Sequence, residues 1–307
     1  MDSFNTMWNR KEKVVIIMGQ TGTGKSRLSI DLATRFSAEV INCDKMQVYE
    51  GLDIVTNKVT EEEQCGIPHH LLGVINPNED FTASDFRRVA MLKIESILAR
   101  KRLPIIVGGS NSFIEALVDD EELEFRSNYH CCFIWVDVSL PLLHSFVSKR
   151  VDQMVKIGLV EEVREMFEPN ADYTKGIRRA IGVPEMDHYL RVEATVDEET
   201  RVKLLDVAIN QIKVNTCNLA CRQLQKIYRL RTLPGWNIHR IDATDVFLAN
   251  GRDMGDAWEK LVAGPSTMIV AEFLYDDDED QTVGIVVPTN DSILTNVIMG
   301  MAVAATQ

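Results

Sequence analysis

Short apolar runs recur at intervals along the first half of the chain. Residues 14–18 form an uninterrupted apolar run that ends at Gly19, and further strand-like runs occupy residues 39–44, 103–107 and 131–138. Runs of this length, bounded by glycine or polar residues, are typical of strands that are buried on both faces of a parallel sheet.

Amphipathic stretches separate these runs. Residues 26–36 and 81–99 both show the spacing of a helix with one apolar face. Strands that alternate with helices predict a doubly wound α/β fold, in which ligands bind beyond the carboxyl ends of the strands. The apolar positions that support the two helices are Leu28, Leu32 and Ala33 in the first, and Phe86, Val89, Ile94, Ile97 and Leu98 in the second.

The pattern changes after Pro141. From there to Arg231 it is mostly helical, and a long amphipathic helix is expected over residues 198–230. Residues 236–242 have the composition of a strand that returns to the sheet. Beyond them the signals weaken, and the acidic run 276–280 is expected to be a solvated loop.

These patterns predict three parts of the chain. Residues 1–140 are expected to form the α/β core, and residues 141–235 a second, mainly helical domain. Residues 236–307 would add the returning strand and a C-terminal extension. No apolar stretch reaches the roughly 20 residues that cross a bilayer, so no membrane association is expected.

The turn after the first apolar run carries a phosphate-binding motif. Residues 19–26 match G-x-x-x-x-G-K-[ST] and lie between a predicted strand and a predicted helix, as a P-loop requires. Lys25 would supply a full positive charge, and the Ser26 hydroxyl would coordinate Mg²⁺. The residues predicted to bind a diphosphate are Gly19, Thr21, Gly22, Thr23, Gly24, Lys25 and Ser26.

A P-loop alone is typical of a small-molecule kinase, but three further segments favour other chemistry. The first, residues 42–58, places Asp44 at the end of the second predicted strand, on the same edge of the sheet as the P-loop. From its position alone Asp44 is either a reactive carboxylate or a helix cap. The other segments are residues 68–86, with a pair of histidines, and residues 104–111, with two glycines and Ser110.

Together with the P-loop, these segments resemble the isopentenyltransferase family. That family includes the tRNA dimethylallyltransferases and the adenylate isopentenyltransferases of cytokinin synthesis. The similarity extends from about residue 14 to about residue 242 and includes Ala180-Ile181-Gly182 and residues 219–223. The tRNA enzymes have a Lys-Arg-Gln pattern in the last segment, so Arg222 is the matching arginine and Cys221 replaces the lysine.

The resemblance implies transfer of a dimethylallyl group from dimethylallyl diphosphate to the N6 amine of an adenine nucleotide, with Mg²⁺. It implies that the P-loop holds the donor's diphosphate and that Arg222 contacts it. Asp44 matches the general base, and Ser110 matches a hydroxyl beside the reacting centre. The catalytic residues expected on this ground are Asp44, Lys25, Ser110 and Arg222.

Four features favour the plant adenylate branch, which makes the first intermediate of cytokinin biosynthesis and uses ATP or ADP more readily than AMP. Lys45 stands where the tRNA enzymes usually have serine, and the stretch between Asp120 and Pro141 lacks their long helical insertion. No zinc finger follows the core, and the net charge of -13 argues against a polynucleotide partner. The resemblance also implies a plastid location, although the N-terminal residues show no transit-peptide character.

The acceptor's phosphates need cations of their own. The candidates are Lys149, Arg150, Arg178, Arg179 and Lys213, each of which is as well explained as a solvated surface charge. Lys213 is the weakest, because about two and a half helical turns separate it from Arg222. A tRNA-modifying enzyme, a P-loop kinase and a non-catalytic nucleotide-binding module remain alternatives, and a monomer is expected.

Overall fold

The computed structural model describes residues 11–120, 124–249 and 253–275. The described residues up to Ala271 belong to one compact unit, and a second unit begins at Glu272. The acidic run 276–280 and most of the predicted C-terminal extension lie outside the described residues.

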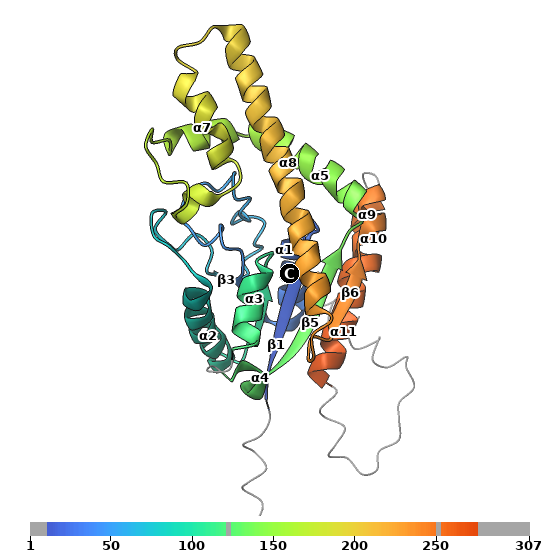
Figure 1. Ribbon diagram of the computed structural model, residues 1–307. Coiled ribbons are helices and arrows are strands. Elements are labelled where there is room, and N and C mark those ends of the chain that lie inside the picture. Colours follow the sequence, from blue (N-terminus) through green and yellow to red (C-terminus); the bar gives the residue numbers. More distant parts are fainter. Residues whose placement is uncertain (1–10, 121–123, 250–252, 276–307) are drawn as a thin grey trace, which may run out of the picture. The chain divides into compact units, whose positions relative to one another are not determined.

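A six-stranded parallel sheet organises the first unit (Figure 1). Its order is β3-β2-β4-β1-β5-β6, which confirms the predicted doubly wound fold. The strands are β1 (Glu12–Gly19), β2 (Ala38–Asn42), β3 (His69–His70), β4 (Leu103–Val107), β5 (Tyr129–Asp137) and β6 (Ile238–Asp242).

Strand β1 lies at the centre of the sheet because its side chains can be buried on both faces. Val14 to Met18 are all 0% exposed, and β1 pairs with β5 from Glu12↔Tyr129 to Gly19↔Val136. Successive side chains of a strand point to opposite faces, so one set joins the large core cluster while Val15 and Ile17 face the other side.

Helices connect the strands in the core. They are α1 (Lys25–Phe36), α2 (Ala83–Ala99), α3 (Asn111–Val118) and α4 (Phe125–Asn128). Helix α2 begins where predicted because Thr82 and Asp85 form a capping box, in which each side chain accepts a backbone N–H of the other. Helix α3 and the two-residue strand β3 had no clear pattern in the sequence, because both are short.

Residues 141–235 form helices and no strand, as predicted. They contain most of α5 (Leu140–Lys156), then α6 (Leu159–Glu165), the 3₁₀ helix η1 (Gly176–Arg179), α7 (Val183–Val192) and α8 (Glu198–Leu230). Asp197 caps the N-terminus of the long helix α8, because its carboxylate accepts the Thr200 N–H at 2.9 Å. It contacts α5, α7, α3 and strand β1, so it joins the helical part to the sheet (Figure 1).

Strand β6 returns to the sheet beside β5, as predicted, and is followed by helices that the sequence did not predict. These are α9 (Thr244–Leu248), α10 (Asp253–Trp258), a π-helical turn η2 (Glu259–Ala263) and α11 (Gly264–Tyr275). Within the described residues, no helix is long and apolar enough to span a membrane.

Candidate active site

One cavity of about 760 Å³ lies where the P-loop meets the ends of β2 and β4 and the helices α5 and α8. This is the edge at which a doubly wound sheet binds ligands. Its lining includes Thr21, Gly22, Gly24, Lys25 and Ser26 of the P-loop, Asn42 at the end of β2, Asp44 and Gln47 after it, and Arg150, Arg179, Arg222 and Gln223 from the helical part.

The P-loop curls around the N-terminus of α1. Gly24 caps this helix with φ 93°, a left-handed conformation that glycine adopts without strain. Lys25 is 8% exposed, and its Nζ donates to the Gln20 carbonyl at 2.6 Å. Burial lowers the pKa of Lys25 to about 8; the Asp44 carboxylate opposes this shift and the Arg150 guanidinium adds to it. An anion in the cavity would restore favourable surroundings for this ammonium group.

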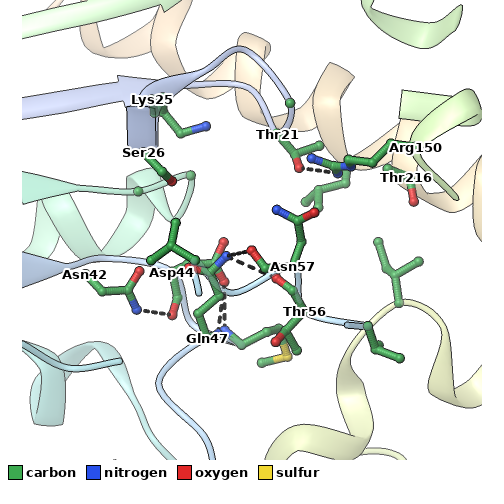
Figure 2. A pocket seen from close by; sticks show the side chains of 18 of the residues that line it. Thr21, Lys25, Ser26, Asn42, Asp44, Gln47, Thr56, Asn57, Arg150 and Thr216 are labelled. Carbon is green, nitrogen blue, oxygen red and sulfur yellow. Dashed lines mark hydrogen bonds between the residues drawn. The ribbon is translucent and has the colours of Figure 1, made fainter. Parts of the chain in front are cut away.

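Asp44 begins the segment that follows β2. The predicted strand 39–44 ends at Asn42, because the Asp44 side chain starts a turn: its Oδ1 accepts the N–H groups of Met46 at 2.9 Å and Gln47 at 3.4 Å. Within the described residues, both hydrogen bonds that this carboxylate accepts are made through Oδ1. Asp44 can therefore cap the turn and also react, because its second carboxylate oxygen remains for a ligand in the cavity that it lines (Figure 2).

The Gln47 side chain fixes the loop that contributes Val55, Thr56 and Asn57 to the cavity wall. Its amide nitrogen donates to the carbonyls of Thr56 and Asn57, both at 3.0 Å (Figure 2). These bonds hold the loop of residues 52–58 over the end of β2, and Val55, Thr56 and Asn57 line the cavity. The sequence motif contained Gln47 but did not indicate this role.

Gln223 on α8 ties the P-loop to the end of β4. Its Oε1 accepts the Thr21 N–H at 2.7 Å, and its Nε2 donates to the Gly109 carbonyl at 3.1 Å. A Cβ on Gly109 would lie 2.2 Å from that Nε2, so only glycine allows the contact. Gln223 follows Arg222 in the matched segment, and this adjacency was the only sequence signal of its importance.

Arg150 on α5 also reaches the P-loop. Its guanidinium donates to the Thr21 hydroxyl at 2.9 Å (Figure 2), and burial lowers the pKa of Arg150 to about 10. Arg179 approaches from η1, where it donates to the Tyr49 hydroxyl oxygen at 3.0 Å and to the Gly176 carbonyl at 3.2 Å. Both arginines line the cavity.

Of the remaining predicted site residues, only some line the cavity. Arg222 lines the cavity, whereas Ser110 lies at the start of α3, and its hydroxyl accepts the Lys45 N–H at 2.9 Å. Lys149, Arg178 and Lys213 are not among the residues that line the cavity. Lys149 is exposed, Arg178 pairs with Glu168 at 2.9 Å, and Lys213 pairs with Asp152 at 2.5 Å. Their roles toward the acceptor stay predictions.

One part of the cavity wall is apolar. It combines side chains from the loop after β2, from α5 and α6, from the segment after η1 and from α8, so the cavity offers a hydrophobic region beside a strongly charged one. The apolar residues that these elements contribute to the lining include Val55, Met154, Leu159, Ala180, Ile181 and Ile212.

The described residues hold no group of three or more His, Cys, Asp or Glu side chains that suits a metal ion. The His69–His70 pair serves structure, since His70 Nε2 lies 2.7 Å from the Glu39 carboxylate within the sheet. Metal binding in the cavity would depend on oxygen ligands such as Ser26 and Asp44, together with phosphate oxygens.

Sequence comparison identifies relatives along most of the chain. A family model described as IPP transferase matches residues 47–125 and 119–228. Adenylate isopentenyltransferase 5, chloroplastic, of Arabidopsis thaliana is 62% identical over 88% of this chain and 83% of its own length. The mitochondrial adenylate isopentenyltransferase 7 of this plant is 56% identical over 90% of this chain and 84% of its own length. The tRNA dimethylallyltransferase 2 of the same plant is 31% identical over 88% of this chain and 82% of its own length.

Solved structures show the same architecture. A eukaryotic dimethylallyltransferase that acts on tRNA superposes with a TM-score of 0.73 at 25% identity, covering 87% of this chain and 80% of that one. A tRNA isopentenylpyrophosphate transferase from Bacillus halodurans gives 0.65 at 27%, covering 88% and 100%. The resemblance first indicated by the P-loop, residues 42–58 and Arg222 is thus confirmed: the chain belongs to the IPP transferase family and, within it, groups with the adenylate isopentenyltransferases.

Proposed function

We propose that this protein transfers a dimethylallyl group from dimethylallyl diphosphate to N6 of the adenine of free ATP or ADP, and of AMP less well. The observation that carries the proposal is that a diphosphate-binding P-loop and the Asp44 carboxylate open into one cavity. The reaction would be the first step of cytokinin biosynthesis. The 56–62% identity to adenylate isopentenyltransferases, against 31% to a tRNA dimethylallyltransferase, supports the choice of acceptor.

The donor occupies the P-loop side of the cavity. The backbone amides of Gly22 and residues 24–26 and the Lys25 ammonium bind its diphosphate, together with Arg222, which also lines the cavity. The five-carbon chain lies against the apolar wall that includes Val55 and Ile212. These cations face the negative charge that accumulates on the leaving diphosphate in the transition state.

Asp44 serves the acceptor. The exocyclic amine of adenine is a weak nucleophile, because its lone pair is delocalised into the ring. As N6 forms its bond to C1 of the dimethylallyl group, the C1–O bond to the diphosphate breaks, and the N6 proton passes to the free oxygen of Asp44. The products are the N6-dimethylallyl nucleotide and diphosphate, and no covalent enzyme intermediate is needed.

Mg²⁺ is the proposed metal. The site fits it, because the Ser26 hydroxyl and nearby carboxylate and amide oxygens face the cavity while the described residues form no cage of three or more ligands. Mg²⁺ is usually bound by one or two protein oxygens together with substrate phosphates and water. When bound, it would neutralise charge on the diphosphate and favour its departure.

Arg150 and Arg179 are the best-placed cations for the acceptor's phosphates, since both line the cavity outside the P-loop. In this scheme residues 1–140 supply the P-loop and Asp44, residues 141–235 add Arg222 for the donor and the cations for the acceptor, and residues 236–307 extend the core. A monomer suffices, because every proposed group comes from one chain. The close relatives are named chloroplastic or mitochondrial, and we favour the plastid.

The deciding experiment incubates the protein with dimethylallyl diphosphate, Mg²⁺ and, in separate reactions, AMP, ADP, ATP or tRNA. We expect prenylated ADP and ATP, less prenylated AMP, and no modified tRNA. Efficient modification of tRNA alone would overturn the choice of acceptor. Release of the γ-phosphate of ATP to a small metabolite, without any prenylated product, would establish the kinase alternative.

A further inference from the structure

Trp258 lies at the end of α10, beyond residue 228, where the matches to the family model end. Although it follows the last strand of the sheet, its side chain is only 4% exposed. The sequence patterns did not predict that this tryptophan is buried. In the folded chain its indole ring packs against the P-loop.

The edge of the indole ring lies against the backbone of Gly24. A Cβ built on Gly24 would lie 2.7 Å from both Cζ3 and Cη2 of Trp258. Gly24 is the residue whose left-handed conformation turns the P-loop into α1. The ring therefore fills the space beside this turn, and the turn cannot relax in that direction without displacing it.

Two further contacts fix the indole on the same face of α1. Its Nε1 donates to the Asp31 carboxylate at 2.7 Å, and the Arg27 guanidinium lies 4.5 Å from the ring centroid. Gly24, Arg27 and Asp31 are three and four residues apart, so they follow one stripe of the helix. All three line the cavity, and the indole supports this wall from behind.

The segment after Trp258 is held on α1 as well. Arg35, in the last turn of α1, pairs with Glu259 at 2.7 Å and donates to the Thr267 hydroxyl at 2.6 Å. Glu259 is the first residue of the π-helical turn Glu259–Ala263, and Thr267 lies in the helix that follows this turn. Contacts at both ends of α1 keep the indole in register with the P-loop.

We propose that Trp258 is a positioning residue for the donor: it holds Gly24 and the first turn of α1 in the conformation whose amides bind a diphosphate. This inference rests on the proposal that the P-loop is the donor site. It makes the segment 253–271 part of the donor-binding machinery, although no residue of that segment needs to touch the substrate.

Trp236 provides a matched control. It is also buried, at 3% exposure, its Nε1 donates to a carboxylate, Asp119, at 3.0 Å, and an arginine, Arg126, lies over its ring. Its ring packs against Phe133 of β5 and not against the P-loop. Truncation of either tryptophan removes a similar volume and similar contacts, so only an effect on the P-loop distinguishes them.

The test measures binding of inorganic pyrophosphate with Mg²⁺ by calorimetry, and the KM values for donor and acceptor, in Trp258→Ala, Trp258→Phe and Trp236→Ala. We expect Trp258→Ala to weaken pyrophosphate binding and to raise the donor KM by about tenfold or more, the scale of a small misplacement of binding groups. The acceptor KM should change little, and Trp258→Phe, which keeps a ring beside Gly24, should recover part of the loss.

Unchanged pyrophosphate binding in Trp258→Ala would overturn the inference, and so would an equal loss in Trp236→Ala. If Trp258→Ala does not fold, the same comparison is made between Trp258→Phe and Trp236→Phe. Lys25→Ala separates this inference from the proposed function. If Lys25→Ala still binds pyrophosphate, the P-loop is not the donor site. If Lys25→Ala loses pyrophosphate binding but Trp258→Ala does not, only the role of Trp258 is rejected.

Discussion

The backbone N–H of Thr21 donates to Oε1 of Gln223 at 2.7 Å, although the two residues are 202 positions apart. The same glutamine amide donates to Gly109 at the end of β4. One side chain of α8 therefore holds the P-loop and the neighbouring strand end in a fixed relation, and the cavity between them depends on it.

Gln223→Ala should weaken donor binding and lower stability. It leaves the Thr21 N–H and the Gly109 carbonyl without their partner, and an unsatisfied buried group costs about 1–3 kcal/mol. Chemical denaturation and the donor KM measure the two effects. Gln225→Ala, at an exposed position two residues further along α8, is the control and should change neither. Equal behaviour of the two variants would contradict the bridging role of Gln223.

Pyrophosphate affinity should fall as the pH rises through about 8. Burial lowers the pKa of Lys25 to about 8, so the free protein loses this positive charge between pH 7 and pH 9. Above this pKa, Lys25 must take up a proton when pyrophosphate binds, so the apparent affinity for pyrophosphate decreases at alkaline pH. Calorimetry at several pH values with Mg²⁺ held constant tests this. Lys25→Ala should bind pyrophosphate weakly at every pH. If its affinity declines at alkaline pH as in wild type, a group other than Lys25 causes the decline.

Asp44→Asn should lower turnover by roughly 10²–10⁴-fold, the usual contribution of a general base. The amide keeps the size of the carboxylate, and its oxygen can still accept the Met46 and Gln47 N–H groups, so folding and pyrophosphate binding should survive. Turnover and calorimetry on the same preparation measure both. Glu50→Gln, at an exposed carboxylate within the same segment, is the control. Turnover within a few-fold of wild type would make Asp44 a purely structural cap.

Glu39→Gln should destabilise the protein at neutral pH, and the difference should shrink in acid. Glu39 is 4% exposed on β2, and hydrogen bonds from Arg100 and His70 lower the pKa of its carboxyl below 4.5. A carboxyl whose pKa is depressed on folding contributes stability above its unfolded pKa and loses it as the pH falls through the folded pKa.

Thermal or urea unfolding of wild type and Glu39→Gln at pH 7 and near pH 4 tests this expectation. The loss at pH 7 should be about 1–3 kcal/mol, as for hydrogen bonds to a charged group. Glu165→Gln, an exposed carboxyl on α6, should behave like wild type. A stability difference that is the same at both pH values would show that the charge of Glu39 is irrelevant.

The C-terminal helices show where pattern analysis reaches its limit. Trp258 and Val262 are buried against the core, yet α9, α10 and η2 are only five or six residues long. Segments this short carry too few apolar positions to establish a period. Their conformation depends on contacts that only the folded chain provides: Trp258 and η2 pack on α1, and Phe247 of α9 packs on Phe146 of α5.

Local sequence determined the longer strands and helices and the P-loop of this protein. The apolar runs produced strands because buried parallel strands need side chains that are apolar on both faces, and residues 19–26 formed a P-loop because the turn between strand and helix has its own backbone requirements. Tertiary structure decided which distant groups join that motif. Gln223 reaches Thr21, Arg150 reaches the same residue, and Trp258 reaches Gly24, whereas Lys149, Arg178 and Lys213 stay outside the cavity lining. Residue type and spacing limit what a side chain can do, but the packing of helices on the sheet decides what it meets.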